Sequence, residues 1–260
     1  MNLEQPEKII NIGYEKSCDC KPSHLNCLTG KEWVVNQLGV WKFSFTKQDV
    51  RDKKIHPATF PLALCHKIIK LFSHEGELVL DPFSGIGTTL VAAKDLNRNA
   101  IGFDLKEEYI NYSKERVKNH IGIVESRQES IWDDARNISS YLPKDSVKLI
   151  WTSPPYANML NRIRKNKSRR SRGNEQLGLI EQYSQDERDL GTYEIDKYSN
   201  HLGSIFEMLL PILKPKGHCV INVPDMWMDN KRITIHISVI DEMRRRGYEL
   251  RNIIIWDRTN

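Results

Sequence analysis

A run of four residues in the middle of the chain has the side chains to do chemistry: Ser153-Pro154-Pro155-Tyr156. It follows residues 147–151, four of which are apolar and which predict a buried strand. The Ser153 hydroxyl and the Pro154 carbonyl can accept hydrogen bonds from an amino group, and the Tyr156 ring can stack on a planar base. The prolines fix the backbone and remove competing N–H donors. These residue types suit alkylation of an exocyclic amine, whose lone pair must be drawn out of conjugation. A proline turn with an ordinary core tyrosine is the alternative.

A second motif is a glycine-containing loop between a predicted strand, residues 78–80, and a predicted helix, residues 90–97. Its candidate cofactor-binding residues are Asp81, Pro82, Phe83, Ser84, Gly85, Gly87, Thr88 and Thr89. Because Gly85 and Gly87 lack a Cβ atom, a cofactor could approach this backbone closely. The third glycine of a dinucleotide fingerprint and the lysine of a phosphate loop are both missing, which disfavours nicotinamide and nucleoside triphosphate ligands.

Asp104 closes the next predicted strand, residues 100–103, about twenty residues beyond the loop. In Rossmann-like sheets an acidic side chain at this place binds ribose hydroxyls. Asp104 is therefore a further candidate for cofactor binding.

With both motifs in place, the chain resembles the S-adenosylmethionine-dependent amino-methyltransferases of DNA, which modify cytosine N4 or adenine N6. The resemblance implies that Ser153-Pro154-Pro155-Tyr156 is the catalytic motif and that S-adenosyl-L-methionine is the cofactor. His56 and Pro57 match a segment that helps to enclose the methionine part of the cofactor. Asp134 matches an acidic residue placed against its adenine amine.

The resemblance also implies a mechanism of direct methyl transfer to a base flipped out of DNA, with no metal or electron carrier. Serine before Pro-Pro-Tyr is usual for cytosine N4 in this family, whereas Asp or Asn is usual for adenine N6. A hydroxyl can accept from either amine, so adenine N6 stays open. Methyl transfer to RNA or protein glutamine, a non-catalytic DNA-binding module and another nucleotide-binding enzyme are weaker alternatives.

The coarse pattern predicts an α/β fold, a Rossmann-like, doubly wound and mainly parallel sheet of the class I methyltransferase type. Predicted strands open near residues 77, 100, 131, 147 and 218, predicted helices span residues 61–72, 196–213 and 233–246, and residues 248–256 form a long β-rich run. We expect an N-terminal arm over residues 1–55 and a catalytic domain over 56–260, with an insertion at about 157–200.

Charge is concentrated in that insertion. Seven basic residues and no acidic residue lie between positions 162 and 172: Arg162, Arg164, Lys165, Lys167, Arg169, Arg170 and Arg172. We expect them to contact DNA phosphates, with a solvated loop as the alternative. The chain ends at residue 260 without a separate recognition region, so target recognition would come from residues 157–200, the N-terminal arm, a second copy in a homodimer or another protein. A cognate restriction endonuclease is a further expected partner.

The cysteines predict a reducing compartment. Their number, five in 260 residues, is odd, and the sequence has neither a signal-like N-terminus nor a membrane-length apolar stretch, so we expect a cytoplasmic protein. Cys18, Cys20, His24 and Cys27 could together bind zinc. The tight Cys-x-Cys spacing and the lack of a second paired half make reduced loop thiols the default expectation.

Overall fold

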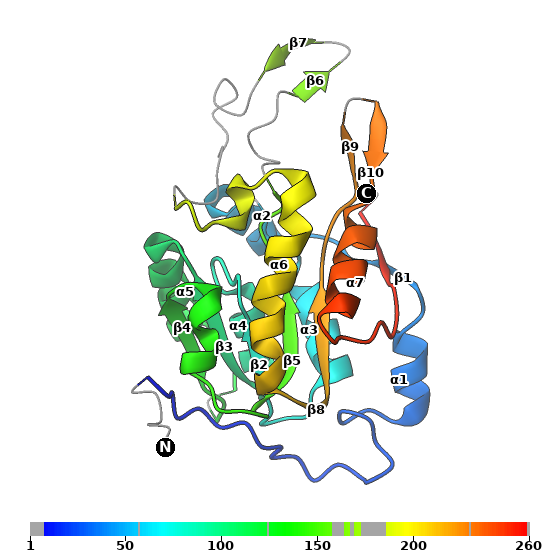
Figure 1. The fold of residues 1–260 in the computed structure, drawn as a ribbon. Coiled ribbons are helices and arrows are strands. Elements are labelled where there is room, and N and C mark those ends of the chain that lie inside the picture. Colours follow the sequence, from blue (N-terminus) through cyan, green and yellow to red (C-terminus); the bar gives the residue numbers. More distant parts are fainter. Residues whose placement is uncertain are drawn as a thin grey trace, which may run out of the picture. The chain divides into compact units, whose positions relative to one another are not determined.

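The computed structural model describes residues 8–56, 58–123, 125–157, 186–228 and 230–258, and the backbone of 164–166 and 169–172. The chain forms two compact units. Their helices and strands are labelled in Figure 1. The first comprises Met1–Thr152, Leu209–Ile221 and Arg251–Asn260, and the second comprises Ser153–Met208 and Asn222–Leu250.

A five-stranded parallel sheet forms the centre of the first unit, with strand order β4-β3-β2-β5-β8. Its strands are β2 (Leu78–Asp81), β3 (Asn99–Asp104), β4 (Gln128–Trp132), β5 (Val147–Thr152) and β8 (Leu213–Ile221). The order runs outward in both directions from β2 and β5, which is a doubly wound arrangement with its topological switch point between these two strands. Ligands of such sheets bind beyond the carboxyl ends of the strands at that point.

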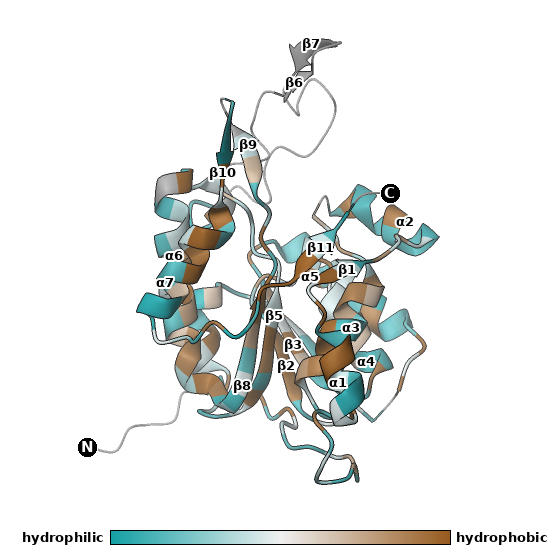
Figure 2. Ribbon diagram, turned by 90° about the vertical axis from the view of Figure 1, so that its right-hand side faces the viewer, coloured by the Kyte–Doolittle hydropathy of each residue, from teal (hydrophilic) through white to brown (hydrophobic). Residues whose placement is uncertain are grey.

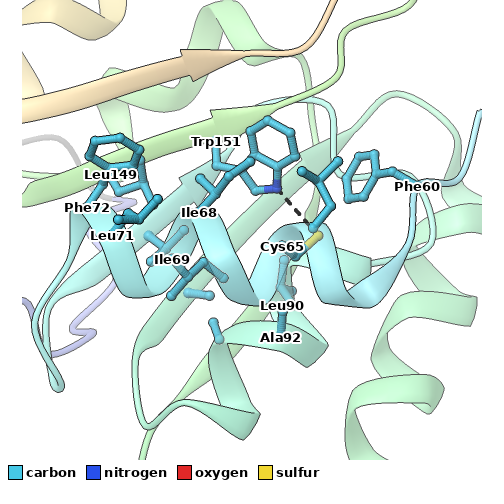
Figure 3. Packing of buried hydrophobic residues seen from close by; sticks show 14 of the residues in the cluster. Phe60, Cys65, Ile68, Ile69, Leu71, Phe72, Leu90, Ala92, Leu149 and Trp151 are labelled. Carbon is cyan, nitrogen blue, oxygen red and sulfur yellow. Dashed lines mark hydrogen bonds between the residues drawn. The ribbon is translucent and has the colours of Figure 1, made fainter. Parts of the chain in front are cut away.

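Both faces of this sheet are covered, as a parallel sheet requires. On one face lie α3 (Leu62–Phe72) and α4 (Thr88–Asp95), whose apolar side chains pack against β5 in a buried cluster (Figure 3). The Trp151 indole Nε1 lies 3.5 Å from the Cys65 sulfur within that cluster. On the other face, the ring of Tyr141, at the end of the 3₁₀ helix η1 (Ala135–Ser140), meets Phe103. Figure 2 shows the apolar residues of α3 in brown.

The remaining elements of the first unit are α1 (Gly30–Asn36), β1 (Val40–Lys42), α2 (Lys47–Ile55), α5 (Glu107–Asn119), η4 (Leu210–Ile212) and β11 (Ile255–Asp257). The helices α1 and α2 each begin with a capping box, Thr29 with Glu32 and Thr46 with Asp49. The strand β1 pairs in parallel with β11.

The second unit contains η3 (Leu190–Thr192), α6 (Ile195–Leu209), α7 (Ile235–Arg245) and two antiparallel strand pairs. The pairs are β6 (Arg164–Asn166) with β7 (Arg169–Arg172), and β9 (Met226–Met228) with β10 (Lys231–Ile233). The helices α6 and α7 pack closely at Gly203, where a Cβ atom would lie 3.3 Å from the Glu242 Cβ. Arg246 reinforces this contact with an ion pair to Glu207.

The predicted fold class is confirmed: the sheet is parallel, and its five predicted strands and the four predicted helices are all present. One expectation is wrong. Residues 248–256 do not form a long strand, because only Ile255–Asp257 find a strand partner there, β1. In the described part of the chain, every helix is too short or too polar to span a membrane.

Candidate functional site

Asp81 links the start of the glycine loop to the two central strands. It is the last residue of β2, and its Oδ1 accepts hydrogen bonds from the Thr152 hydroxyl (2.6 Å) and the Phe83 N–H (3.2 Å). Its Oδ2 accepts from the Thr89 hydroxyl at 2.5 Å. Burial raises the pKa of Asp81 to about 6, although these hydrogen bonds act in the opposite direction. Asp81 therefore fixes the loop, the first turn of α4 and the end of β5 together.

The two glycines of the loop have left-handed backbone angles, with φ of +50° at Gly85 and +76° at Gly87. A Cβ atom on Gly85 would lie 3.0 Å from the His56 Nε2, and one on Gly87 would lie 2.0 Å from the Ser113 Oγ. The glycines thus let His56 and α5 approach the loop. This packing role stands beside the close approach of a cofactor that the sequence predicts.

Asp104 lies at the end of β3, beside the loop. Its Oδ2 accepts a hydrogen bond from the Gly85 N–H at 2.8 Å, and its Oδ1 accepts from the Lys106 N–H at 2.9 Å. The buried Ser84 Oγ has no hydrogen-bond partner among the described residues. A half-buried carboxylate and an orphaned buried hydroxyl on a glycine turn form a polar cradle that fits a ribose-containing cofactor.

An ion pair behind the loop escaped the sequence analysis. Arg116 of α5 donates to the Ile86 carbonyl (3.1 Å) and the Thr88 hydroxyl (2.9 Å). Its guanidinium pairs at 2.7 Å with Asp52, a fully buried carboxylate of α2. These contacts hold the loop in shape from the protein side. No local pattern could have indicated them, because Asp52 lies 64 positions before Arg116 in the chain.

His56 and Asp134 occupy different surroundings. The His56 ring packs against Tyr109 with centroids 4.7 Å apart, and burial together with repulsion by Lys106 lowers its pKa to about 4. Asp134 caps η1 and accepts from the Arg136 N–H (2.9 Å) and guanidinium (2.7 Å). Pro57 lies outside the described residues, and the buried Pro82 and half-buried Phe83 lie in the loop itself.

The catalytic candidates Ser153 and Tyr156 follow β5 directly and are half-buried. Their hydroxyl groups share a hydrogen bond, which brings the two ends of the Ser-Pro-Pro-Tyr motif together. Pro154 and Pro155 form the turn between them, with Pro154 buried.

Asn222 completes this group and was not predicted. Its side-chain N–H group donates to the Ser153 Oγ at 3.2 Å and to the Tyr156 Oη at 3.1 Å. Asn222 directly follows Ile221, the end of β8. A polar residue immediately after the apolar residues Val220 and Ile221 was the signal available for finding it.

The basic run is described only as backbone. The antiparallel strands β6 and β7 carry five of its seven residues: Arg164, Lys165, Arg169, Arg170 and Arg172. Arg162 and Lys167 lie outside the described residues. Contact of this run with DNA therefore stays a prediction.

Comparison with known proteins agrees with the motifs. Residues 3–115 and 147–260 match the family described as DNA methylase, N6_N4_Mtase. The type II methyltransferase M.HpaI of Haemophilus parainfluenzae is 40% identical over 94 residues, which cover 36% of this chain and 30% of that protein. The orphan methyltransferase M.BamHII of Bacillus amyloliquefaciens is 38% identical over 126 residues, 47% of each chain. These alignments thus span less than half the length of the curated relatives.

A crystal structure of a TehB-like SAM-dependent methyltransferase from Corynebacterium glutamicum is 15% identical, with a TM-score of 0.42 and coverage of 79% of this chain and 82% of that chain. The family match includes both the glycine loop and the Ser-Pro-Pro-Tyr motif. S-adenosyl-L-methionine is accordingly the cofactor of this chain, which belongs to the DNA methylase family.

Proposed function

We propose that the chain methylates the exocyclic N4 amine of a cytosine flipped out of DNA. The observation that carries this proposal is the hydroxyl pair of Ser153 and Tyr156, held by Asn222 directly after β5. Bound S-adenosyl-L-methionine supplies a methyl group on a sulfonium, which is already activated for transfer. The protein is therefore required to orient the amine more than to supply a strong acid or base.

Ser153 is the acceptor for the target amine in this proposal. The side-chain NH₂ group of Asn222 is a donor, so it occupies one lone pair on the Ser153 Oγ and one on the Tyr156 Oη. If Ser153 donates its own proton to Tyr156, one lone pair of the Ser153 Oγ is left for an N–H of the amine. The Pro154 carbonyl supplies a second acceptor, and the Tyr156 ring supplies a stacking surface worth about 1–3 kcal/mol.

Cofactor binding is assigned to the loop and its neighbours. We propose that Asp104 accepts hydrogen bonds from the ribose hydroxyls, and that Ser84 and the backbone of Gly85 and Gly87 line the cradle. His56 and Pro57 would enclose the methionine part, and Asp134 would face the adenine amine. The Asp81 network holds this loop from the protein side.

Cytosine N4 is proposed over adenine N6 because the first motif residue is serine. The family's adenine enzymes usually place Asp or Asn there, and a hydroxyl offers fewer acceptor sites to the amine than a carboxylate does. Adenine N6 is the second candidate, since serine can accept from either amine. We also propose that the enzyme prefers a particular DNA sequence. A cognate endonuclease or a second copy of the chain is its proposed partner.

The test uses S-adenosyl-L-methionine with an isotopically labelled methyl group and unmethylated duplex DNA. After digestion to nucleosides, mass spectrometry should find the label in N4-methyl-2′-deoxycytidine, and much less of it in DNA treated for the same time with Ser153→Ala protein. Label in N6-methyl-2′-deoxyadenosine would show that the target is adenine N6 and not cytosine N4. Label in RNA or protein substrates but not in DNA would contradict the proposal.

A further inference from the structure

Three cysteines near the N-terminus and one distant histidine meet in the first unit. The cysteine sulfurs of Cys18, Cys20 and Cys27 and the Nδ1 of His74 all lie within 4.8 Å of one another. His24, the histidine suggested by sequence proximity, is not a member of this group, and His74 takes its place from the segment between α3 and β2. We propose that these four side chains bind a structural zinc ion.

Five of the six distances between the four atoms are close to those of a small tetrahedron, and the sixth, between the sulfurs of Cys20 and Cys27, is below 4.8 Å. Cys18 Sγ lies 3.4 Å from Cys20 Sγ and 3.3 Å from Cys27 Sγ. The His74 Nδ1 lies 3.5, 3.3 and 3.4 Å from the sulfurs of Cys18, Cys20 and Cys27. Zn–S bonds of about 2.3 Å and Zn–N bonds of about 2.0–2.1 Å would place sulfur pairs about 3.8 Å apart and sulfur–nitrogen pairs about 3.6 Å apart. A zinc ion at the centre thus requires the ligands to move by only a few tenths of an ångström.

A disulfide explains the group less well. The sulfurs are well beyond the bonding distance of about 2.05 Å, and one bridge would leave a third thiol and an imidazole aimed at it. Three thiolates and one imidazole are a complete ligand set for tetrahedral zinc, and soft sulfur ligands favour zinc over magnesium or calcium.

The protein holds both halves of the site independently of a metal. The N–H of Ser17, which precedes Cys18, donates to the carbonyl of Glu75, which follows His74, at 2.8 Å. The Asn26 side chain, next to Cys27, donates to the Leu71 carbonyl at the end of α3 at 2.5 Å. The ligands therefore converge because two chain segments are already bound to each other.

The charge of the surroundings also suits such a site. Zinc with three thiolates carries a net charge of −1. The guanidinium of Arg98, 5% exposed, interacts electrostatically with both Cys27 and Cys18. It also donates to the carbonyl of Ser73, the residue before His74, at 2.8 Å, and this hydrogen bond holds the guanidinium in place.

The location argues for a structural role. His74 precedes the amino end of β2, whereas the glycine loop follows the carboxyl end of that strand. Four protein ligands also close the coordination sphere and leave no open position for a substrate. The ion would fasten residues 15–28 to the turn before β2, and this role does not depend on the proposed methyl transfer.

The test is metal analysis by inductively coupled plasma mass spectrometry of the full chain, purified without a polyhistidine tag after growth with zinc. We expect about one zinc ion per chain in the wild-type protein and in the control His24→Ala, and loss of most of it in His74→Ala and Cys27→Ala. His74→Cys, which supplies a fourth thiolate, should retain zinc. Wild-type protein without zinc, or equal zinc in His74→Ala and His24→Ala, would overturn the proposal.

A second measurement on wild-type protein applies even if the His74 and Cys27 variants fail to fold. Exchange of zinc for Co²⁺ should produce thiolate-to-cobalt charge-transfer bands and the intense visible bands of tetrahedral cobalt. Removal of the metal by a chelator should lower the midpoint of thermal unfolding of wild type and of His24→Ala. A cobalt spectrum without thiolate bands, or an unchanged midpoint after verified metal removal, would count against the site.

Discussion

At the scale of single residues, the Ser-Pro-Pro-Tyr motif depends on a residue outside it. Ser153 and Tyr156 share one hydrogen bond, and Asn222 donates to both oxygens from the end of another strand. Asn222 touches no reacting atom in the proposed chemistry, so it is a positioning residue. Its amide decides which lone pair of Ser153 is available to the substrate.

Asn222→Ala should slow methyl transfer about 10- to 30-fold, because it removes two hydrogen bonds of roughly 1 kcal/mol each and leaves only the mutual hydrogen bond to orient the two hydroxyl groups. The Michaelis constant for the cofactor should stay within about twofold, since Asn222 is not among the residues proposed to bind the cofactor. Steady-state kinetics with DNA separates these parameters. A turnover number equal to wild type would show that Asn222 does not position Ser153.

Gly87 is the loop residue most sensitive to substitution. Gly87→Ala places a Cβ atom 2.0 Å from the Ser113 Oγ in a backbone with φ of +76°. Clash and backbone strain together should lower the free energy of unfolding by about 2–4 kcal/mol. Urea denaturation measures this change. Gly30→Ala, where nothing lies within 4 Å, is the control and should be nearly neutral. Equal stability of the two variants would refute the packing argument.

At the scale of elements, Asp81 joins β2, α4 and β5 through hydrogen bonds from Thr89 and Thr152. Arg116 and Asp52 hold the same loop through α5 and α2. The loop is therefore held by contacts among five elements, and such preorganisation reduces the entropy cost of binding.

Asp81 also predicts a pH dependence of stability. Its pKa rises from 3.8 to about 6 on folding, so the native state holds the proton more tightly. This stabilising contribution is present below about pH 4 and is lost as the pH rises to about 6, an effect of about 3 kcal/mol. Asp81→Asn stays neutral and should lack this loss, whereas the control Asp145→Asn, at an exposed carboxylate, should follow wild type. The measurement is the free energy of unfolding from pH 4 to 7. The same pH profile in all three proteins would refute the raised pKa of Asp81.

The elements that were predicted correctly are those with strong local signals. Leu78, Val79 and Leu80 are continuous, apolar and β-forming, and the glycine loop after them marks where the strand ends. The run at residues 248–256 ends in four apolar, β-forming residues, but a strand needs a partner. The only partner among the described residues, β1, reaches just Ile255–Asp257 from 215 positions earlier in the chain.

The site residues that could be predicted from the sequence are likewise those with a local signal. Ser153, Gly85 and Asp104 lie in contiguous motifs, whereas Asn222 and the Arg116–Asp52 pair come together only through the topology of the fold. The zinc hypothesis shows the same limit: proximity in sequence suggested His24, and the fold brings His74 to the cysteines.

At the scale of the whole molecule, the sheet with its cofactor loop lies in one compact unit and the basic strands β6 and β7 lie in the other. The seven basic residues between positions 162 and 172 are the densest positive charge in the sequence. Phosphate contacts release counterions, so they make DNA affinity steeply dependent on salt.

Replacing Arg164, Lys165 and Arg169 with Gln should weaken DNA binding and reduce the slope of log affinity against log salt by about 0.9 for each lost contact. Cofactor affinity should not change. The control replaces Lys31, Lys47 and Lys144, three exposed lysines of the other unit, and should keep the wild-type slope. Fluorescence anisotropy on duplex DNA across a salt series measures both. Superimposable lines for the two triple variants would exclude a DNA contact by the basic run.

The central claim is that Ser153 acts on the target amine while the loop of the first unit holds the cofactor. The most direct test is the single-turnover rate of methyl transfer by Ser153→Ala, measured beside calorimetric titration with S-adenosylhomocysteine. We predict a rate at least about tenfold below wild type, equal to about 1.4 kcal/mol of transition-state stabilisation, with cofactor affinity within about twofold. A wild-type rate from folded Ser153→Ala protein would contradict the account.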